Sequence, residues 1–219
     1  MLSRPKGGVG SLPAPISGIT FVMVEKMSSA QPANQTATRS PDLTPRDWLE
    51  AGQSLLRRGG LKALKLRPLA DELRVSTGSF YHHFKDFDDY QGQLARYFAE
   101  DQVGDLIEAL ERATADPIAR IRLLGQTVRR RGSSRLAIAM RAWAESDPRA
   151  QAAVERHDTL LLDFLARCLA ASGFTRHEAE IRAYGLITLG LSKVHAPQLD
   201  RATLFDSLLD IMIARPAAG

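Results

Sequence analysis

The chain of 219 residues has a single cysteine, Cys168. One thiol cannot form an internal disulfide, and it offers no cluster of metal ligands. Because Cys168 stands on an apolar helical pattern, a buried inert thiol is expected rather than a redox sensor. No apolar run is long enough to cross a membrane, so the sequence predicts no membrane partner.

Catalytic motifs are missing as well. The sequence has no H-x-x-x-H pair, no G-x-S-x-G, no glycine loop of the kind that cradles phosphate, and no cysteine–histidine couple. Each of these motifs supplies a defined metal site, nucleophile or phosphate site. We therefore expect no enzymatic activity, no cofactor and no metal.

Positive charge is concentrated in one window of the chain. The net charge is +4, from 29 basic and 25 acidic residues, which is weak support for a nucleic-acid partner. Residues 44–85 contain eight basic and four acidic residues, which gives +4 for this window alone. Residues 133–219 contain ten of each, which cancel. A local excess of this kind is what phosphate binding requires.

Two short helices joined by a tight turn are predicted within that window, over residues 67–73 and 77–84. Leu69, Ala70 and Leu73 share one apolar face, and Phe80 and Phe84 repeat this spacing on the second helix. Ser76 is predicted to cap the second helix through its hydroxyl.

The polar residues at the start of the second helix are left outside the core. They are Thr77, Gly78, Ser79, Tyr81, His82 and His83. This is the end of the helix that a helix-turn-helix protein presents to base edges.

Helical patterns occupy the rest of the chain from Thr44 onward, and no convincing strand pair or internal repeat is present. Residues 1–43 have no helical period and are predicted to form a disordered arm. Translation from Met27, or an arm that reaches DNA, are the alternatives there. Counted from Thr44, nine helices are predicted, which makes the fold all-α. The further ranges are 45–59, 86–113, 117–130, 133–145, 148–172, 176–195 and 200–214.

The sequence resembles the TetR family of transcriptional regulators between Thr44 and about Tyr90. The resemblance lies in Leu66-Arg67-Pro68-Leu69-Ala70 and in the run from Val75 to Phe84. It implies an amino-terminal three-helix helix-turn-helix DNA-binding domain, residues 44–90, and a helical ligand-binding and dimerisation domain, residues 91–215.

The resemblance also implies a function. Family members are homodimers that bind double-stranded DNA, commonly repress transcription, and are released from a palindromic operator by a small molecule. The expected location is the cytoplasm, at the nucleoid. The expected dimer interface lies in residues 176–195 and 200–214, where Gly185 and Gly190 indicate close helix approach. A helical enzyme, or a ligand-binding protein that does not bind DNA, is the alternative.

Carried over by position, the resemblance implies a set of DNA contacts. These are Arg67, Thr77, Gly78, Ser79, Tyr81, His83 and Lys85. Three positions depart from the family pattern. Arg74 stands where glycine is common in the turn, and Phe87 stands where a basic residue usually contacts a phosphate. Lys65 and Leu66 occupy the start of the second helix, where a threonine or serine cap is common.

The resemblance implies a ligand pocket in the carboxy-terminal part of the chain, although plain core packing is the default expectation for its aromatic and methionine residues. The candidate lining residues are Met140, Trp143, His157, Phe164 and Tyr184.

Overall fold

The structure, a computed structural model, describes residues 43–192, 198 and 201–214. All of them belong to one compact unit, Ser40–Gly219. The regular secondary structure of the described residues is helical, so the predicted all-α class is confirmed. Of the predicted arm, residues 1–43, only Leu43 falls among the described residues. None of the described helices is long and apolar enough to span a membrane.

Helix α1 (Pro45–Gly59) begins with a reciprocal capping box. The Thr44 hydroxyl accepts from the Asp47 backbone N–H, and the Asp47 carboxylate accepts from the Thr44 backbone N–H at 2.7 Å. The Thr44 hydroxyl also donates to the Asp47 carboxylate at 2.6 Å. This bond, together with the one from the Thr44 backbone N–H, holds the pKa of Asp47 below its ordinary value. The helix ends at Gly60, whose φ of 63° favours glycine. The boundaries agree with those predicted.

A short 3₁₀ turn, η1 (Leu61–Ala63), leads to α2 (Leu66–Leu73) and α3 (Thr77–Phe80). The predicted extension of α3 to residue 84 is wrong, because the chain continues from Tyr81 in tighter turns that place the Phe80 and Phe84 rings 5.0 Å apart. The predicted Ser76 cap is also wrong. The Ser76 side chain makes no capping hydrogen bond, and the Ser79 N–H donates to the Ser76 carbonyl oxygen instead.

The segment predicted as one helix, residues 86–113, is two helices, α4 (Phe87–Ala99) and α5 (Asp101–Ala113). Glu100 separates them, with φ −113° and ψ −64°. Its N–H still donates to the Arg96 carbonyl oxygen, so the chain bends at this residue without a loop. The hydrophobic period continues across Glu100, and for that reason the sequence pattern did not reveal the bend.

The remaining helices are α6 (Pro117–Arg131), α7 (Ser133–Ala144), α8 (Pro148–Ala171), α9 (Arg176–Leu191) and α10 (Arg201–Ile213). Helices α6 and α8 each begin with proline after an aspartate cap, and α9 begins with a capping box of Thr175 and Glu178. These starts are as predicted. Residues 193–195 of the predicted range 176–195, and residue 200 of the predicted range 200–214, lie outside the described residues.

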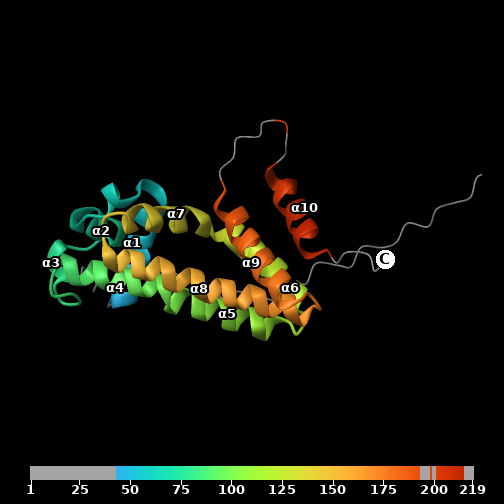
Figure 1. The fold of residues 1–219 in the computed structure, drawn as a ribbon. Helices are drawn as coiled ribbons and strands as arrows, with labels where there is room; N and C mark the ends of the chain where they lie inside the picture. The colour runs from blue at the N-terminus through green and yellow to red at the C-terminus, as the bar shows by residue number, and fades with distance from the viewer. Residues whose placement is uncertain (1–42, 193–197, 199–200, 215–219) are drawn as a thin grey trace, which may run out of the picture. The chain divides into compact units, whose positions relative to one another are not determined.

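Helix α8 runs beside α4 and α5 and also packs against α6, α7 and α9 (Figure 1). One hydrophobic core joins α1–α4 to α7 and the start of α8, and includes Trp48, Phe80 and Trp143. A second core joins the remainder of α8 to α5, α6, α9 and α10. Cys168 is buried in the second core, and this burial raises the pKa of its thiol, as expected for an inert group.

Close packing between α1 and α4 generates a stability prediction. Tyr90 is fully buried, its hydroxyl donates to the Trp48 carbonyl oxygen at 2.9 Å, and a Cβ added at Gly52 would overlap that hydroxyl. We expect Gly52→Ala to lower the free energy of unfolding by about 1–3 kcal/mol, because overpacking displaces the tyrosine. Thermal unfolding measures the effect.

The matched control is Gly104→Ala on α5, where an added Cβ meets no atom within 4 Å. Relief of glycine backbone entropy should stabilise this variant by about 0.5–1 kcal/mol. Equal melting temperatures for the two variants would contradict the packing described at Gly52.

Candidate nucleic-acid interface and internal cavity

The predicted DNA contacts lie together on α2, α3 and the turn after α3. Four of these residues are exposed: Arg67, Thr77, Gly78 and Lys85. Tyr81 is 60% exposed despite its aromatic ring. Ser79 and His83 are half-buried, and His83 lies against Trp48 with ring centroids 6.4 Å apart. The structure thus brings these residues to one surface, with His83 at its inner edge.

The Phe80 side chain anchors this surface to the hydrophobic core. Its ring is fully buried and lies 5.4 Å from the Trp48 ring and 5.5 Å from the Tyr90 ring, both edge to face. A helix of four residues has too few hydrogen bonds to be stable alone. Helix α3 is therefore fixed by Phe80, which orients Thr77 and Tyr81 outward.

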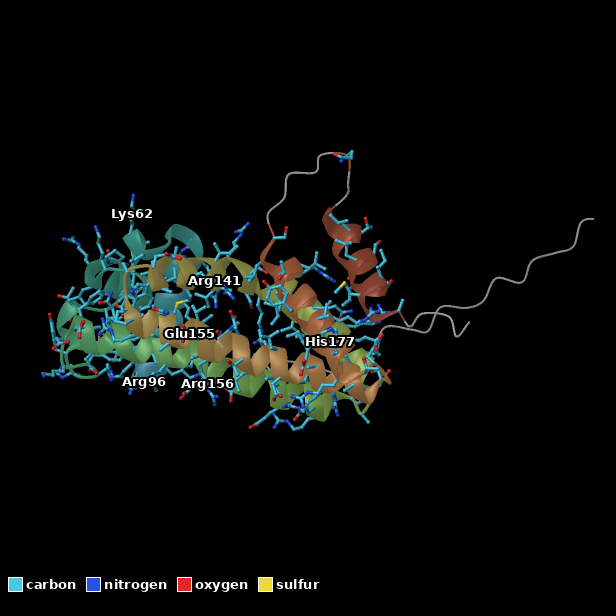
Figure 2. The ribbon with its side chains drawn as sticks, viewed as in Figure 1. Lys62, Arg96, Arg141, Glu155, Arg156 and His177 are labelled. Carbon is cyan, nitrogen blue, oxygen red and sulfur yellow. The ribbon has the colours of Figure 1, made fainter. Side chains whose placement is uncertain are left out.

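The cations of this surface are largely unneutralised. Arg58 pairs with Glu72 at 2.6 Å, and Arg46 pairs with Glu50 at 3.0 Å. Within the described part of the chain, no ion pair is formed by the exposed residues Lys62, Lys65, Arg67, Arg74 and Lys85. Lys62 projects outward between α1 and α2 (Figure 2). Unpaired exposed cations are suited to phosphate contacts.

The three departures from the family pattern have different consequences. Lys65 is the residue before α2, and its side chain makes no capping hydrogen bond. Arg74 adopts φ 57° and ψ 40°, the left-handed conformation that glycine takes without cost. A non-glycine residue there costs about 1 kcal/mol. Phe87 is half-buried against the Phe80 and Tyr90 rings, so it supports the core and supplies no phosphate contact.

A largely apolar cavity of about 120 Å³ lies among α5, α6, α7, α8 and α9. Leu106, Leu124, Leu161 and Leu165 supply much of its wall. Its lining, mostly apolar with a few polar groups, is typical of a site for a small apolar or amphipathic molecule.

Of the predicted pocket residues, only His157 lines this cavity. Met140, Trp143 and Phe164 are buried in the two cores, and Tyr184 is 68% exposed on α9. These four residues do not line the cavity, and core packing, the default expectation, holds for Met140, Trp143 and Phe164. Aromatic residues at helical spacing reveal burial, but whether a side chain faces a core or a cavity depends on how the helices pack.

An ion pair missed by the sequence prediction closes one wall of the cavity. Arg141 projects from α7 toward α8, where its Nη2 donates to both carboxylate oxygens of Asp158 at 2.6 and 2.7 Å (Figure 2). His157 Nδ1 lies 3.1 Å from the same carboxylate, and its ring stacks on Phe98 at 4.4 Å. Burial opposes ionisation of Asp158, but the hydrogen bond with His157 and the charge of Arg141 outweigh it and lower the pKa.

A second polar junction connects α8 to α4. The Asp147 carboxylate caps α8 through the Arg149 N–H at 2.9 Å and accepts from the Trp143 Nε1 at 3.2 Å. Arg149 pairs with Asp147 at 2.9 Å and with Asp88, at the start of α4, at 3.0 Å. Helix α4 therefore contacts α8 through a charged link as well as through the apolar core.

Comparisons with known proteins agree with this geometry. Residues 49–88 match the family model of bacterial regulatory proteins, tetR family. This segment extends from α1 to the start of α4 and includes the whole of α2 and α3. No curated protein matches the chain in sequence.

Solved structures share the fold over most of their length. A transcriptional regulator from Rhodococcus sp. Rha1 is 23% identical, with a TM-score of 0.61 over 78% of this chain and 94% of that chain. A TetR transcriptional regulator from Legionella pneumophila is 15% identical, with a TM-score of 0.62 over 78% and 94%. AibR, in complex with isovaleryl coenzyme A and operator DNA, is 16% identical, with a TM-score of 0.54 over 76% and 96%.

The fold and the exposed helix pair define a helix-turn-helix protein whose remaining helices line a cavity. Residues 49–88 match the tetR family model, and the fold is similar to that of solved transcriptional regulators, one of them a TetR regulator. The predicted resemblance is therefore confirmed.

The junction at Asp147 generates a pH prediction. Mainly through its hydrogen bonds with Arg149, the pKa of Asp147 is lowered from 3.8 to about 2. Because the folded pKa lies below the unfolded one, the carboxylate stabilises the protein above about pH 4, and this contribution is lost as the pH falls toward 2. We expect Asp147→Asn to cost at most about 2 kcal/mol at pH 7.

Thermal unfolding of Asp147→Asn and the wild type between pH 7 and pH 2 measures this difference. The two melting temperatures should converge as the pH falls. Glu145→Gln, at an exposed neighbouring residue, should show no such convergence. A pH-independent difference at Asp147 would mean that its charge does not stabilise the fold.

Proposed function

We propose that the protein is a ligand-responsive DNA-binding transcriptional regulator without enzymatic activity. The exposed face of α3, flanked by unpaired cations and matched to the family model, carries this proposal. Arg67, Thr77, Gly78, Ser79, Tyr81, His83 and Lys85 are the proposed contacts. Repression is the proposed mode, relieved when a small molecule occupies the cavity. The complex of AibR with a small molecule and operator DNA supports the compatibility of this fold with both partners.

We further propose that the regulator acts as a homodimer in the cytoplasm. Ile181, Tyr184 and Ile211 are exposed apolar or aromatic residues on α9 and α10, and they favour an interface there. Ala183 and Leu186 are buried within the subunit, and an added Cβ at Gly185 would meet Met212 Cε at 2.5 Å, so these residues pack inside the subunit. A symmetric dimer would read a palindromic operator.

The deciding experiment is selection of bound sequences from a pool of random DNA duplexes, followed by footprinting. A palindromic consensus supports the proposal. Absence of any retained duplex at low salt, after denaturation and refolding to remove bound ligand, contradicts it and favours a ligand-binding protein that does not bind DNA. Affinity should fall steeply with salt, because cations released from phosphates drive binding.

Substitutions on the proposed reading surface should weaken DNA binding without unfolding the protein. Arg67→Ala and Tyr81→Ala remove exposed groups, and each should weaken binding about tenfold, or 1.4 kcal/mol. Gel-shift titration measures the affinity for DNA, and thermal unfolding measures the stability of the fold. Arg135→Ala, at an exposed arginine on α7, serves as the charge control and should leave affinity unchanged.

Phe80→Ala should behave differently, because removal of a fully buried ring costs about 3–5 kcal/mol of stability. If Tyr81→Ala lowered the melting temperature as far as Phe80→Ala does, Tyr81 would be a structural residue and not a surface contact.

The dimer proposal is tested by Tyr184→Glu. A charge buried without a partner at an interface disfavours association, so sedimentation should give a monomer at micromolar concentration. Tyr81→Glu is the matched control, because Tyr81 directly follows α3 and is about as exposed as Tyr184. The Tyr81→Glu variant should remain dimeric. A wild-type monomer, or a dimeric Tyr184→Glu variant, would rule out this interface.

A further inference from the structure

The polar side chains in the inner wall of the cavity are engaged with one another or with a neighbouring helix. Arg141 of α7 and Asp158 of α8 both line the cavity, and Arg141 Nη2 donates to the two carboxylate oxygens at 2.6 and 2.7 Å. His157, also in the wall, places Nδ1 3.1 Å from the same carboxylate. Gln102 Nε2 donates to Gln53 Oε1 on α1 at 2.9 Å. The pKa of Asp158 lies below its ordinary value, so the carboxylate is ionised at neutral pH and neutralises Arg141.

The other arginine of the lining, Arg131, stands at the end of α6. It is exposed, so its guanidinium is hydrated by solvent whether or not a ligand is present. An anion that left water to meet an exposed guanidinium would gain little, because charge pairs in contact with solvent are weak. Arg131 therefore does not offset the cost of transferring a charge into the cavity.

The remainder of the wall is mostly aliphatic. It is built from α5, α6, α8 and α9, and includes Leu106, Leu124, Leu161 and Leu186. An ion in such surroundings loses its hydration without meeting a free counter-charge, and this costs far more than burial of a neutral polar group. Beside the ion pair, an anion would be repelled by the carboxylate and a cation by the guanidinium.

Hydrogen-bonding groups suited to a neutral partner are still available in the wall. Arg141 Nη1 donates to the Ala137 carbonyl oxygen at 3.2 Å, whereas Arg141 Nε donates to no described residue. Nε is not among the fully buried unpaired polar atoms either, so it is accessible. Ser133 and Ser134 contribute hydroxyl groups at the start of α7. An oxygen of an uncharged molecule can accept from Nε without disturbing the bonds to Asp158.

We propose that the cavity binds an uncharged, mostly apolar molecule whose carbonyl or hydroxyl oxygen accepts a hydrogen bond from Arg141. Asp158 determines this selectivity, because by neutralising Arg141 it removes the charge that would otherwise attract an anion. The pair is therefore a specificity determinant as well as a link between α7 and α8. This inference rests on the proposed function, because it names the chemical class of the molecule that occupies the cavity.

The cavity shares wall residues with the core beneath the proposed DNA-binding surface. Phe98 of α4 and Leu136 and Ala137 of α7 line the cavity. The same three residues belong to the hydrophobic core that contains Trp48 and Phe80. A molecule that binds one packing of this core better than another shifts the protein toward that packing. Occupancy of the cavity is therefore expected to change the affinity for DNA.

Ligand-observed NMR titration of the wild-type protein with three six-carbon compounds tests the charge preference. 2-Hexanone, hexanoate and hexylammonium have bodies of similar size and differ in the charge of the polar group. The ketone should bind at least ten times tighter than either ion at neutral pH. Binding of either ion as tight as that of the ketone, or no binding of the ketone, overturns the proposal.

Asp158→Asn tests the neutralisation. This change leaves Arg141 without a counter-charge, so hexanoate should bind at least ten times tighter than it binds to the wild type. Glu155→Gln is the matched control, because Glu155 is an exposed carboxylate on the preceding turn of α8 and is not among the lining residues (Figure 2). It should leave hexanoate binding unchanged. Unchanged hexanoate affinity in Asp158→Asn overturns the role of Asp158.

A double variant, Arg141→Met combined with Asp158→Leu, keeps the proposal testable if Asp158→Asn fails to fold. Apolar residues of similar volume commonly replace a buried ion pair without loss of stability. The double variant should still disfavour both ions, and it should bind 2-hexanone about ten times more weakly, because a hydrogen bond from a charged donor is lost. Wild-type affinity for 2-hexanone in this variant would mean that Arg141 does not bind the oxygen.

A final measurement separates this inference from the proposed function. Saturating 2-hexanone should change the affinity of the wild-type protein for its selected DNA, and the double variant should need about ten times more ketone for the same effect. If the protein binds DNA but prefers an ion, the regulator stands and the ligand class is wrong. If it prefers the ketone but binds no DNA, the regulator is wrong and the ligand class stands. Ketone binding without an effect on DNA affinity overturns the link through the shared core.

Discussion

The aromatic cluster around Phe80 is the interaction on which the rest of the structure depends. Trp48 of α1, Phe80 of α3 and Tyr90 of α4 meet edge to face, and the Tyr90 hydroxyl donates to the Trp48 carbonyl oxygen. Helix α3 is too short to form alone, so its position is set by this contact. Every group on the exposed side of α3 is oriented by the ring buried beneath it.

The same cluster connects the reading surface to the remainder of the molecule. Helix α4 leaves it to run beside α8, and Arg149 fixes the start of α4 to α8 through Asp88 and Asp147. Helix α1 contacts the cavity-lining helix α5 through the hydrogen bond between Gln53 and Gln102. The helices that carry the proposed DNA surface are thus in contact with helices that line the cavity.

Two polar clusters near the cavity differ in one physical respect. Arg141 and Asp158 line the cavity and neutralise each other. Gln53 and Arg57 are not among the lining residues, and they retain donors without acceptors. In a medium of low dielectric constant the first arrangement is stable as it stands.

The sequence by itself determined the helix class, most helix starts and the exposure of the start of α3, because caps, hydrophobic periods and the family pattern are local signals. Thr44 with Asp47, and Thr175 with Glu178, form the capping boxes that their spacing predicts. The bend at Glu100, the early end of α3 and the cavity lining were decided by tertiary structure. Gln53 interrupts the apolar stripe of α1, which was a usable signal, but its bond with Gln102 joins residues 49 positions apart. Only helix packing determines which side chains face a core and which a cavity, and therefore Met140, Trp143 and Phe164 were misplaced while the exposed tip of α3 was not.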